Sequence, residues 1–289
     1  MTGEAQVALL GDGRRLHLHH GPIDIIALAE GGTAEVNAAY SQAGKRFATI
    51  LEELVAELPR LRAPTGAARP LLNGAVARRM GSAVWPHRSV FVTPMAAVAG
   101  AVADDELAAL TAGRDLARVY VNNGGDIAFH LARGQSFDAG IVDDADAPEL
   151  DARVRLTYDM PVRGLATSGW RGRSHSLGIA DAVTVLAECA AQADVAATLI
   201  ANAVDVDHER IERVPANSLF DDSDLGDLPV TVKVGELPSD AIDRALFAGL
   251  ACAHALQARG LIFSAYLSLQ GHLKFAGADV RLSAAGGTT

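Results

Sequence analysis

The sequence predicts an α+β protein with a mainly antiparallel sheet and packed helices, the layered fold in which short turns join strand pairs. Segments typical of strands outnumber those typical of helices, and most neighbouring strand segments are separated only by short turns. The 289 residues are 49% hydrophobic and 21% charged, so the chain can bury a core, and global disorder is excluded. We expect one domain over residues 1–289, with its core at about 14–280, because neither a strong linker nor an internal repeat is visible.

Alternation and helical spacing predict the elements of the first half. Alternating residues before Gly21-Pro22 and the apolar run after it predict a hairpin. Apolar residues then recur every three or four positions from Thr33, the expected N-cap, until Pro59 ends the helix. Pro94 precedes an alanine-dense helix, and 123–126 is expected to turn a second hairpin. The predicted elements are strands at 14–20, 23–29, 89–93, 118–122 and 127–131 and helices at 33–58 and 95–110, with loops over 60–90.

The second half is predicted to continue with short strands and two helices. An alanine-rich helix is expected after residue 190, and Ser239 is expected to cap a helix that Gly260 ends. The acidic and polar stretch 205–229 is expected to be a surface loop, and the C-terminal tail is expected to fray. The predicted elements are strands at 137–142, 153–158, 164–167, 182–186, 230–234 and 261–269 and helices at 190–204 and 239–259.

Charge and cysteine content exclude several classes of partner. The net charge of -10 argues against a nucleic-acid partner, because binding phosphates requires a basic face. No run approaches the roughly 20 apolar residues of a membrane-spanning helix, and the N-terminal residues do not resemble a signal peptide. Cys189 and Cys252 lack metal-type spacing. We therefore expect a cytoplasmic protein with neither nucleic-acid nor membrane partners, and the motifs that follow indicate a small-molecule ligand.

The first candidate site is the turn Asn122, Asn123, Gly124, Gly125 and Asp126. Two glycines allow main-chain N–H groups to approach an anion or a nucleotide closely. Asp126 can accept hydrogen bonds from a ribose, an amide or a ring N–H. The alternative is a hairpin turn closed by an Asx hydrogen bond, with no ligand.

The second candidate site is the polar segment 166–176. Arg171 and Arg173 carry planar guanidinium groups suited to phosphate or carboxylate. His175 titrates near neutral pH and can move a proton, and Trp170 can stack on a flat ring. The alternative is a solvated basic loop in which the indole covers an edge of the core. The ligand-binding residues expected here are Thr167, Ser168, Gly169, Arg171 and Arg173.

The third candidate is the pair Asp194 and Thr198, which share one face of the predicted helix at positions i and i+4. A carboxylate and a hydroxyl there can point at one hard cation, although an acidic residue near a helix start is also a simple dipole match. His17, His19 and His20 leave a zinc site open, but the nearby sequence does not complete a ligand set. The acidic run 221–224 resembles only a fragment of a calcium loop.

The order of these motifs resembles the ApbE superfamily, whose founding members are FAD:protein FMN transferases. Those enzymes carry a GIAKG helix, an N-x-GGD turn, an ATSG…HIIDPxTG segment and an ADALAT helix. The chain is more similar to the ApbE-related UPF0280 family, over residues 14 to 280. The segments that carry this likeness are HGPIDI, FVTPMAAVAGAVAD, YVNNGGDIA and GLATSGWRGRSHSLGIADAVTV.

Departures from the transferase motifs limit what the resemblance implies. Aligning AAVAGAVAD with the GIAKG helix places Ala99 where the transferases have lysine, and little beyond His175 remains of the HIIDPxTG segment. By contrast, Asp194 and Thr198 match the magnesium-binding residues in type and spacing. The third ligand in the transferases is a main-chain carbonyl, which maps near Val98.

The resemblance therefore implies an ApbE-like protein that binds Mg²⁺ and FAD or FMN, or another phosphate-bearing planar ligand, as a transferase or hydrolase. In this reading His175 is the acid or base, and the segments 122–126, 166–175 and 190–204 line one cleft. Two alternatives stay open. One is a non-catalytic ligand-binding or accessory protein that has lost FMN transferase activity. The other is a protein that forms homo-oligomers through its alanine-rich helices.

Overall fold

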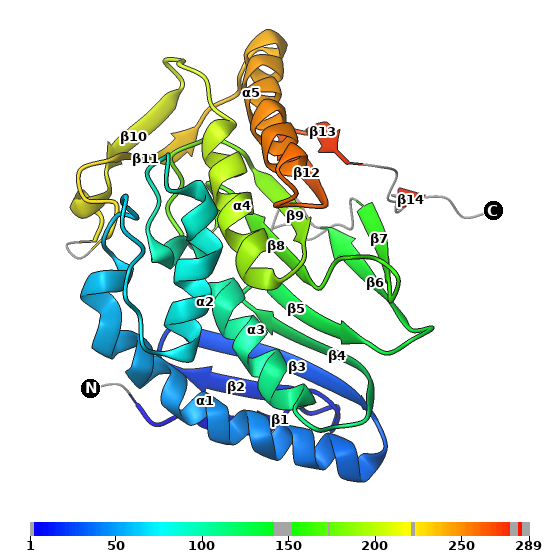
Figure 1. The fold of residues 1–289 in the computed structure, drawn as a ribbon. Helices are drawn as coiled ribbons and strands as arrows, with labels where there is room; N and C mark the ends of the chain where they lie inside the picture. Colours follow the sequence, from blue (N-terminus) through cyan, green and yellow to red (C-terminus); the bar gives the residue numbers. More distant parts are fainter. Residues whose placement is uncertain (1–2, 142–151, 173, 221–222, 278–282, 285–289) are drawn as a thin grey trace. The chain divides into compact units, whose positions relative to one another are not determined.

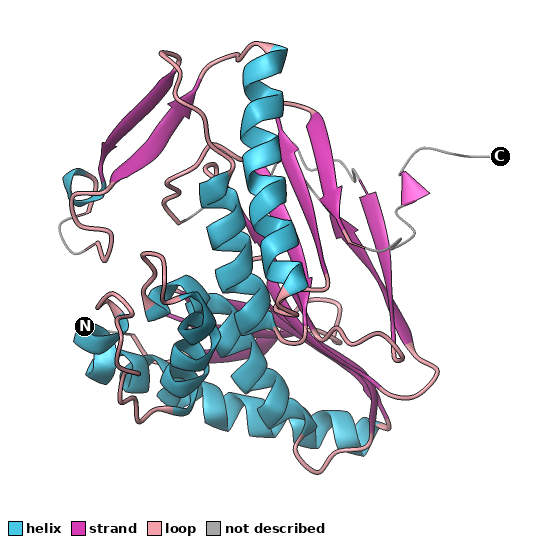
Figure 2. Ribbon diagram, turned by 45° about the horizontal axis from the view of Figure 1, so that its top comes forward, coloured by secondary structure: helices cyan, strands magenta, loops and turns pink. Residues whose placement is uncertain are grey.

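The computed structural model describes residues 3–141, 152–172, 174–220, 223–277 and 283–284 (Figure 1). The chain divides into two compact units. The first comprises Met1–Ser136, Thr157–Ala166 and Glu188–Val195, and the second comprises Phe137–Leu156, Thr167–Ala187 and Ala196–Thr289. Both units combine helices with antiparallel strands, so the predicted α+β class is confirmed (Figure 2). The expectation of one domain stays a prediction.

The first unit is an antiparallel sheet with helices on one face. Its strand order is β1-β2-β3-β4-β5-β8, and α1 and α3 pack against β2 to β5 (Figure 1). This arrangement places the start of α3 beside the sheet. The elements are β1 (Gln6–Leu9), β2 (Leu16–His20), β3 (Ile23–Gly31), α1 (Thr33–Leu61), α2 (Ala75–Val84), α3 (Val98–Thr111), β4 (Leu116–Asn123), β5 (Asp126–Leu131) and the beginnings of β8 (Gly164–Ser168) and α4 (Ala190–Ala203).

Burial in the first unit follows the two periodicities of the sequence. Side chains of β2 and β3 are buried at every second position, as expected for strands with one covered face. Along α1, apolar residues spaced three or four apart form the buried stripe. The predicted hairpin and the long helix are confirmed. The fully buried members of the stripe are Ala39, Ala43, Phe47, Ile50 and Leu61.

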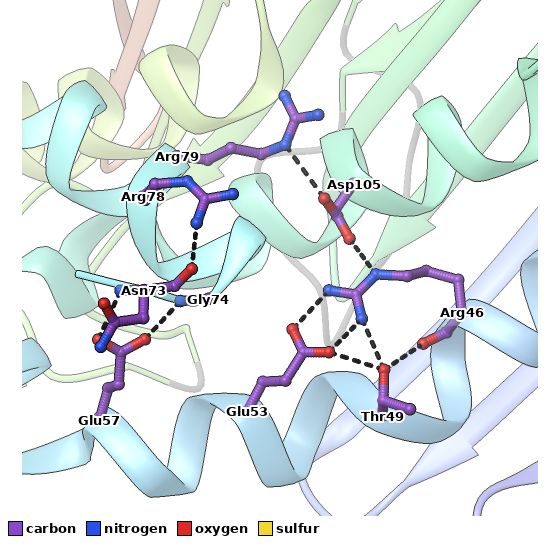
Figure 3. A network of polar contacts seen from close by, with 9 residues as sticks. All are labelled: Arg46, Thr49, Glu53, Glu57, Asn73, Gly74, Arg78, Arg79 and Asp105. Atoms are coloured by element: carbon purple, nitrogen blue, oxygen red, sulfur yellow. Dashed lines mark hydrogen bonds and ion pairs between the residues drawn. The ribbon is translucent and has the colours of Figure 1, made fainter.

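Ion pairs join α1, α2 and α3 in the first unit (Figure 3). Arg46 of α1 binds the Glu53 carboxylate through both terminal nitrogens, at 2.6 and 2.8 Å. Its Nε–H donates to Asp105 of α3 at 2.6 Å. Arg79 of α2 reaches the other oxygen of Asp105 at 3.3 Å. Asp105 therefore ties α3 to both neighbouring helices.

The second unit contains most of the remaining strands. Its strand orders are β8-β9-β12-β13, β14-β7-β6 and the hairpin β10-β11. Helix α5 packs on β12 and β13 (Figure 2). No helix in the described ranges is long and apolar enough to cross a membrane. The elements are β6 (Ser136–Ile141), β7 (Ala152–Thr157), β9 (Ala182–Ala187), β10 (Ile211–Pro215), β11 (Pro229–Val234), α5 (Ser239–Ala258), β12 (Ser264–Leu269), β13 (His272–Ala276) and β14 (Ser283–Ala284), with the ends of β8 and α4.

Several local predictions are wrong. The predicted strand 89–93 is a bend with Val90 and Phe91 exposed, because its apolar residues have no strand to pair with before Pro94 starts a 3-10 turn. The stretch 60–90, predicted as loops, contains α2, whose apolar side chains pack inward despite flanking glycines. The predicted acidic loop contains β10, which pairs with β11.

The capping predictions are wrong by one residue. Gly32 and not Thr33 is the N-cap of α1, and Pro238 and not Ser239 is that of α5; neither makes a side-chain capping bond. Pro59 lies inside α1, which ends at Leu61. Only two helical residues follow Pro59, so the missing N–H affects only the last turn, which persists.

Candidate functional site

The turn between β4 and β5 is a tight hairpin in the first unit. Gly124 and Gly125 have φ of 67° and 111°, values that favour glycine in a two-residue turn. The side-chain oxygen of Asn122 accepts the N–H of Gly125 at 2.8 Å, which is the Asx hydrogen bond of the alternative interpretation, while ligand binding by the turn stays a prediction. Asn123, which is buried, donates from Nδ2 to the carbonyl of Ala99 at 3.1 Å. The turn is therefore held against the start of α3, and Asp126 follows it as a buried residue.

The starts of α3 and α4 lie against each other in the same unit. Asp194 of α4 accepts the N–H of Gly100, in the first turn of α3, at 3.0 Å. Asp104 of α3 accepts the N–H groups of Ala190 and Ala191 at 3.0 and 2.9 Å. Each carboxylate satisfies N–H groups that a helix start leaves without an intrahelical partner.

Burial and neighbouring negative charge both disfavour the ionised form of the carboxylates where the starts of α3 and α4 meet. Burial raises the pKa of Asp194 well above its usual range, and the charge of Asp126 raises it further, against the lowering effect of the N–H bonds. Burial likewise raises the pKa of Asp104. The thiol of Cys189 has its pKa raised to about 12 by burial and by the charge of Asp104, so it is a poor nucleophile at neutral pH.

The carboxylate oxygens of Asp194 and Asp126 are ligands of the kind that a hard cation prefers. A cation relieves the repulsion between two buried carboxylates, and Mg²⁺ prefers oxygen ligands. Asp126 and Asp194 supply such oxygens, and Thr198 lies one helical turn beyond Asp194 on α4. Among the residues that the structure describes, no three His, Cys, Asp or Glu side chains are grouped to hold a metal ion. A site here would therefore combine carboxylate with hydroxyl and main-chain oxygens.

The second unit contains the segment that follows β8. Thr167 is exposed, and its hydroxyl is 2.8 Å from that of Thr184 on β9. Ser168 is half-buried and Gly169 is buried. The Trp170 indole N–H and the Arg171 Nε–H both donate to Asp181, at 3.0 and 3.2 Å. The segment is thus an ordered turn held by one carboxylate.

His175 is half-buried and lies beside an aromatic side chain. Its ring centroid is 5.3 Å from that of Phe220, with the planes tilted by 42°. The next residue, Ser176, is buried and bonds to Asn202 of α4. Arg173, predicted to bind an anion, lies outside the described residues.

The structure brings together part of the predicted set. Asp126 and Asp194 share one corner of the first unit, while Thr167, Ser168, Gly169, Arg171 and His175 belong to the second unit. The expectation that all of them line one cleft stays a prediction. The sequence reasoning assigned no role to Asp104, Gly100 or Asp181. Their partners lie far away in the sequence, so no local pattern pointed to Asp104, Gly100 or Asp181.

The other histidine candidates lie on the hairpin β2-β3. His17 Nε2 and His19 Nδ1 are 3.2 and 3.1 Å from the same oxygen of Asp24, and His20 is buried on the opposite face. Asp24 thus binds two histidines, a contact that the cross-strand pairing of His19 with Asp24 explains.

Comparison with known proteins identifies the family. The family described as AbpE bacteria matches residues 7–275. The chain belongs to this family. Its relatives by sequence include a UPF0280 protein of Methanopyrus kandleri, 41% identical over 133 residues, which are 45% of this chain and 51% of the relative. A UPF0280 protein of Methanocaldococcus jannaschii is 37% identical over 113 residues, 39% of this chain and 45% of the relative.

The expected likeness to UPF0280 proteins is confirmed, and this AbpE protein matches about half the length of those relatives. Among solved structures, the apo flavinyl transferase ApbE of Pseudomonas stutzeri has a TM-score of 0.44 and 11% identity, covering 95% of both chains. A likeness of that degree supports no conclusion about the activity of this protein.

Proposed function

We propose that this AbpE-family protein binds a phosphate-bearing planar ligand together with Mg²⁺ and acts on it as a transferase or hydrolase. Flavin is the first ligand to test, because the motif order resembles that of FMN transferases. The observation that carries the proposal is that the β4–β5 turn and α4 both contact the start of α3: Asn123 donates to the carbonyl of Ala99, and Asp194 accepts the N–H of Gly100. Asp126 follows that turn, and its negative charge repels an ionised Asp194. A bound divalent cation would relieve that repulsion and attract phosphate oxygens.

Each predicted residue has a chemical role in this proposal. Asp194, the hydroxyl of Thr198 and a main-chain carbonyl near Val98 would hold Mg²⁺, which supplies positive charge to a phosphate when bound. Asp126 would orient the ligand. Arg171 and Arg173 would neutralise anionic oxygens, and His175 would move a proton. Asn122, Asn123, Gly124, Gly125, Thr167, Ser168 and Gly169 would offer hydrogen bonds to the ligand.

FAD binding with and without Mg²⁺ tests the proposal directly. We expect FAD fluorescence polarisation to show binding that Mg²⁺ strengthens, and we expect Asp194→Ala to remove that strengthening. Asp240→Ala is the matched control, since Asp240 is an exposed partner of Arg244 at the start of α5. The absence of FAD binding at any Mg²⁺ concentration would exclude flavin as the ligand.

Product analysis tests the reaction. Hydrolysis of the FAD pyrophosphate consumes one water and yields FMN and AMP, whereas transfer moves FMN to an acceptor hydroxyl and releases AMP. Incubation of purified protein with FAD and Mg²⁺, followed by chromatography, distinguishes the two. A mass spectrum of small molecules released from freshly purified protein would identify a different ligand. The proposal also includes a cytoplasmic location, which cell fractionation tests.

The alternative is a non-catalytic binding or accessory protein. Two observations favour it: Ala99 replaces the transferase lysine, and Asp194 already caps the start of α3 through Gly100. The variant Asp194→Asn separates the readings, because an amide oxygen can still accept that N–H but binds Mg²⁺ weakly. An enzyme would lose turnover in this variant while remaining folded. A scaffold would show no turnover to lose and at most a small change in stability.

A further inference from the structure

The carboxylate of Asp181 accepts three hydrogen bonds at the start of β9 in the second unit. Trp170 donates its indole N–H and Arg171 its Nε–H to one oxygen, at 3.0 and 3.2 Å. The main-chain N–H of Gln270 donates to the other oxygen at 2.5 Å. The side chain of Asp181 is only 12% exposed, so its carboxylate is largely shielded from solvent although Arg171 is not.

The backbone of the same segment is also held close to Asp181. The N–H of Trp170 donates to the carbonyl of Ala180 at 3.0 Å. A Cβ atom on Gly169 would lie 2.1 Å from the carbonyl oxygen of Asp181, so only glycine permits this approach. The turn that carries Trp170 and Arg171 is therefore fixed by main-chain as well as side-chain contacts.

Arg171 is held on two sides while its side chain stays 44% exposed. Its guanidinium lies 5.2 Å from the centroid of the Trp170 ring, within the range of a cation–π contact. The Asp181 carboxylate holds Nε, and the same carboxylate holds the indole on which the guanidinium rests. One residue thus sets the positions of both the ring and the cation.

We propose that Asp181 is a positioning residue that holds Arg171 and Trp170 ready for an anionic ring-bearing ligand. The inference rests on the proposed function, in which Arg171 neutralises an anionic group. A free arginine side chain loses rotamer entropy when it binds an anion. An arginine already held by a carboxylate and an aromatic ring has lost that entropy on folding, so binding costs less.

The negative charge of Asp181 should weaken anion binding, whereas its positioning of Arg171 should strengthen it. The affinity of a variant without that charge distinguishes the two effects. A carboxylate next to Arg171 repels an incoming anion. Asp181→Asn removes the repulsion and keeps one acceptor oxygen. The amide nitrogen that replaces the other oxygen cannot accept a hydrogen bond, so some of the present donors lose their acceptor. If Asp181 acts only through its charge, the substitution tightens anion binding. If it positions Arg171, the substitution weakens binding.

The experiment compares Asp181→Asn with Asp240→Asn, an equal change of charge at an exposed position of α5. Both are made in a Trp85→Phe background, so that Trp170 is the only tryptophan. We expect Asp181→Asn to shift Trp170 emission to the red and to increase its quenching by acrylamide. We also expect the Kd for FAD to rise about threefold to tenfold, the size of effect expected when one side chain must be ordered on binding.

The outcomes separate this inference from the proposed function. Unchanged Trp170 emission, or an equal or lower Kd for FAD in Asp181→Asn, overturns the positioning role while the proposed function stands. Failure of the natural protein, measured alongside, to bind FAD overturns the proposed flavin function and this inference with it. A Kd raised by the same factor in the Asp240→Asn control also overturns the inference, because the effect would then not depend on the contacts that Asp181 makes with Trp170 and Arg171.

Discussion

Asp104 and Asp194 cap each other's helices. Asp104, on α3, accepts the N–H groups of Ala190 and Ala191 at the start of α4, and Asp194, on α4, accepts the N–H of Gly100 at the start of α3. At each helix start, therefore, a carboxylate from the other helix accepts main-chain N–H groups. In the proposed function Mg²⁺ binds where these two helix starts meet, so a substitution there is expected to change both the stability of the fold and the binding of the metal.

The first prediction concerns the cap on α4. Ala190 and Ala191 are buried, so Asp104→Ala leaves their N–H groups without an acceptor or water. We expect the free energy of unfolding to fall by about 1–3 kcal/mol. Asp104→Asn should lose less, because its amide oxygen still accepts. Urea unfolding measures both, with Asp240→Ala as a control that is expected to leave the stability almost unchanged, because solvent screens this exposed ion pair. Equal losses in the Ala and Asn variants would contradict the capping role.

The second prediction concerns the close approach of the two helices. A Cβ atom on Gly100 would lie 2.3 Å from the carbonyl oxygen of Ala190, a main-chain atom that cannot move without disturbing α4. We expect Gly100→Ala to lower the melting temperature sharply or to prevent folding. Gly66→Ala is the matched control, since no atom lies within 4 Å of its Cβ position. A melting temperature for Gly100→Ala equal to that of the control would show that the helices are not so closely packed.

Local sequence patterns predicted the elements whose burial is regular. Residues of β2 and β3 alternate between core and solvent, and α1 presents one apolar stripe, so spacing alone was sufficient. The short helix α2 was missed because its ten residues lie between glycines and prolines. The bend at 89–93 was predicted as a strand because a short apolar run is compatible with either structure.

The contacts of the candidate site could be predicted only in part. The Asn122–Gly125 hydrogen bond is local and followed from the turn composition. The bond from Ala190 to Asp104 joins residues 86 positions apart, and that from Gln270 to Asp181 joins residues 89 apart. No periodicity links such positions, since folding alone brings them together. Motif order pointed to Asp194, but its capping of Gly100 required the three-dimensional structure.

The third prediction compares the two arginines that bind Asp105 (Figure 3). Side-chain accessibility is 21% for Arg46, 42% for Arg79 and 8% for Asp105. Arg46→Met removes the shorter of the two contacts with a buried carboxylate and also releases Glu53, so we expect a loss of roughly 2–4 kcal/mol. Arg79→Met should cost less than about 1 kcal/mol, because solvent screens that pair. Urea unfolding of both variants tests the order, and a larger loss for Arg79→Met would contradict it.

The fourth prediction concerns Glu106, which α3 places in the core with 0% exposure. Neither of its carboxyl oxygens has a hydrogen-bond partner among the described residues. Burial, assisted by the charge of Asp105 and opposed by Arg46, raises the pKa of Glu106 from 4.5 to about 8. The folded protein therefore holds this carboxyl protonated at neutral pH, while the unfolded chain releases the proton.

The sign of the pH dependence follows from that difference. Because the folded pKa is raised, the contribution of Glu106 is fully present below pH 4.5 and is lost as pH rises towards 8. We expect this group to lower the unfolding free energy by roughly 3–4 kcal/mol between pH 5 and 8. Glu106→Gln cannot ionise, so it should flatten the profile and be more stable than the natural protein at pH 8. Glu52→Gln, at an exposed position of α1, should leave the slope unchanged. Urea titrations across this range check the prediction, and an equally steep slope in Glu106→Gln would assign the effect to other groups.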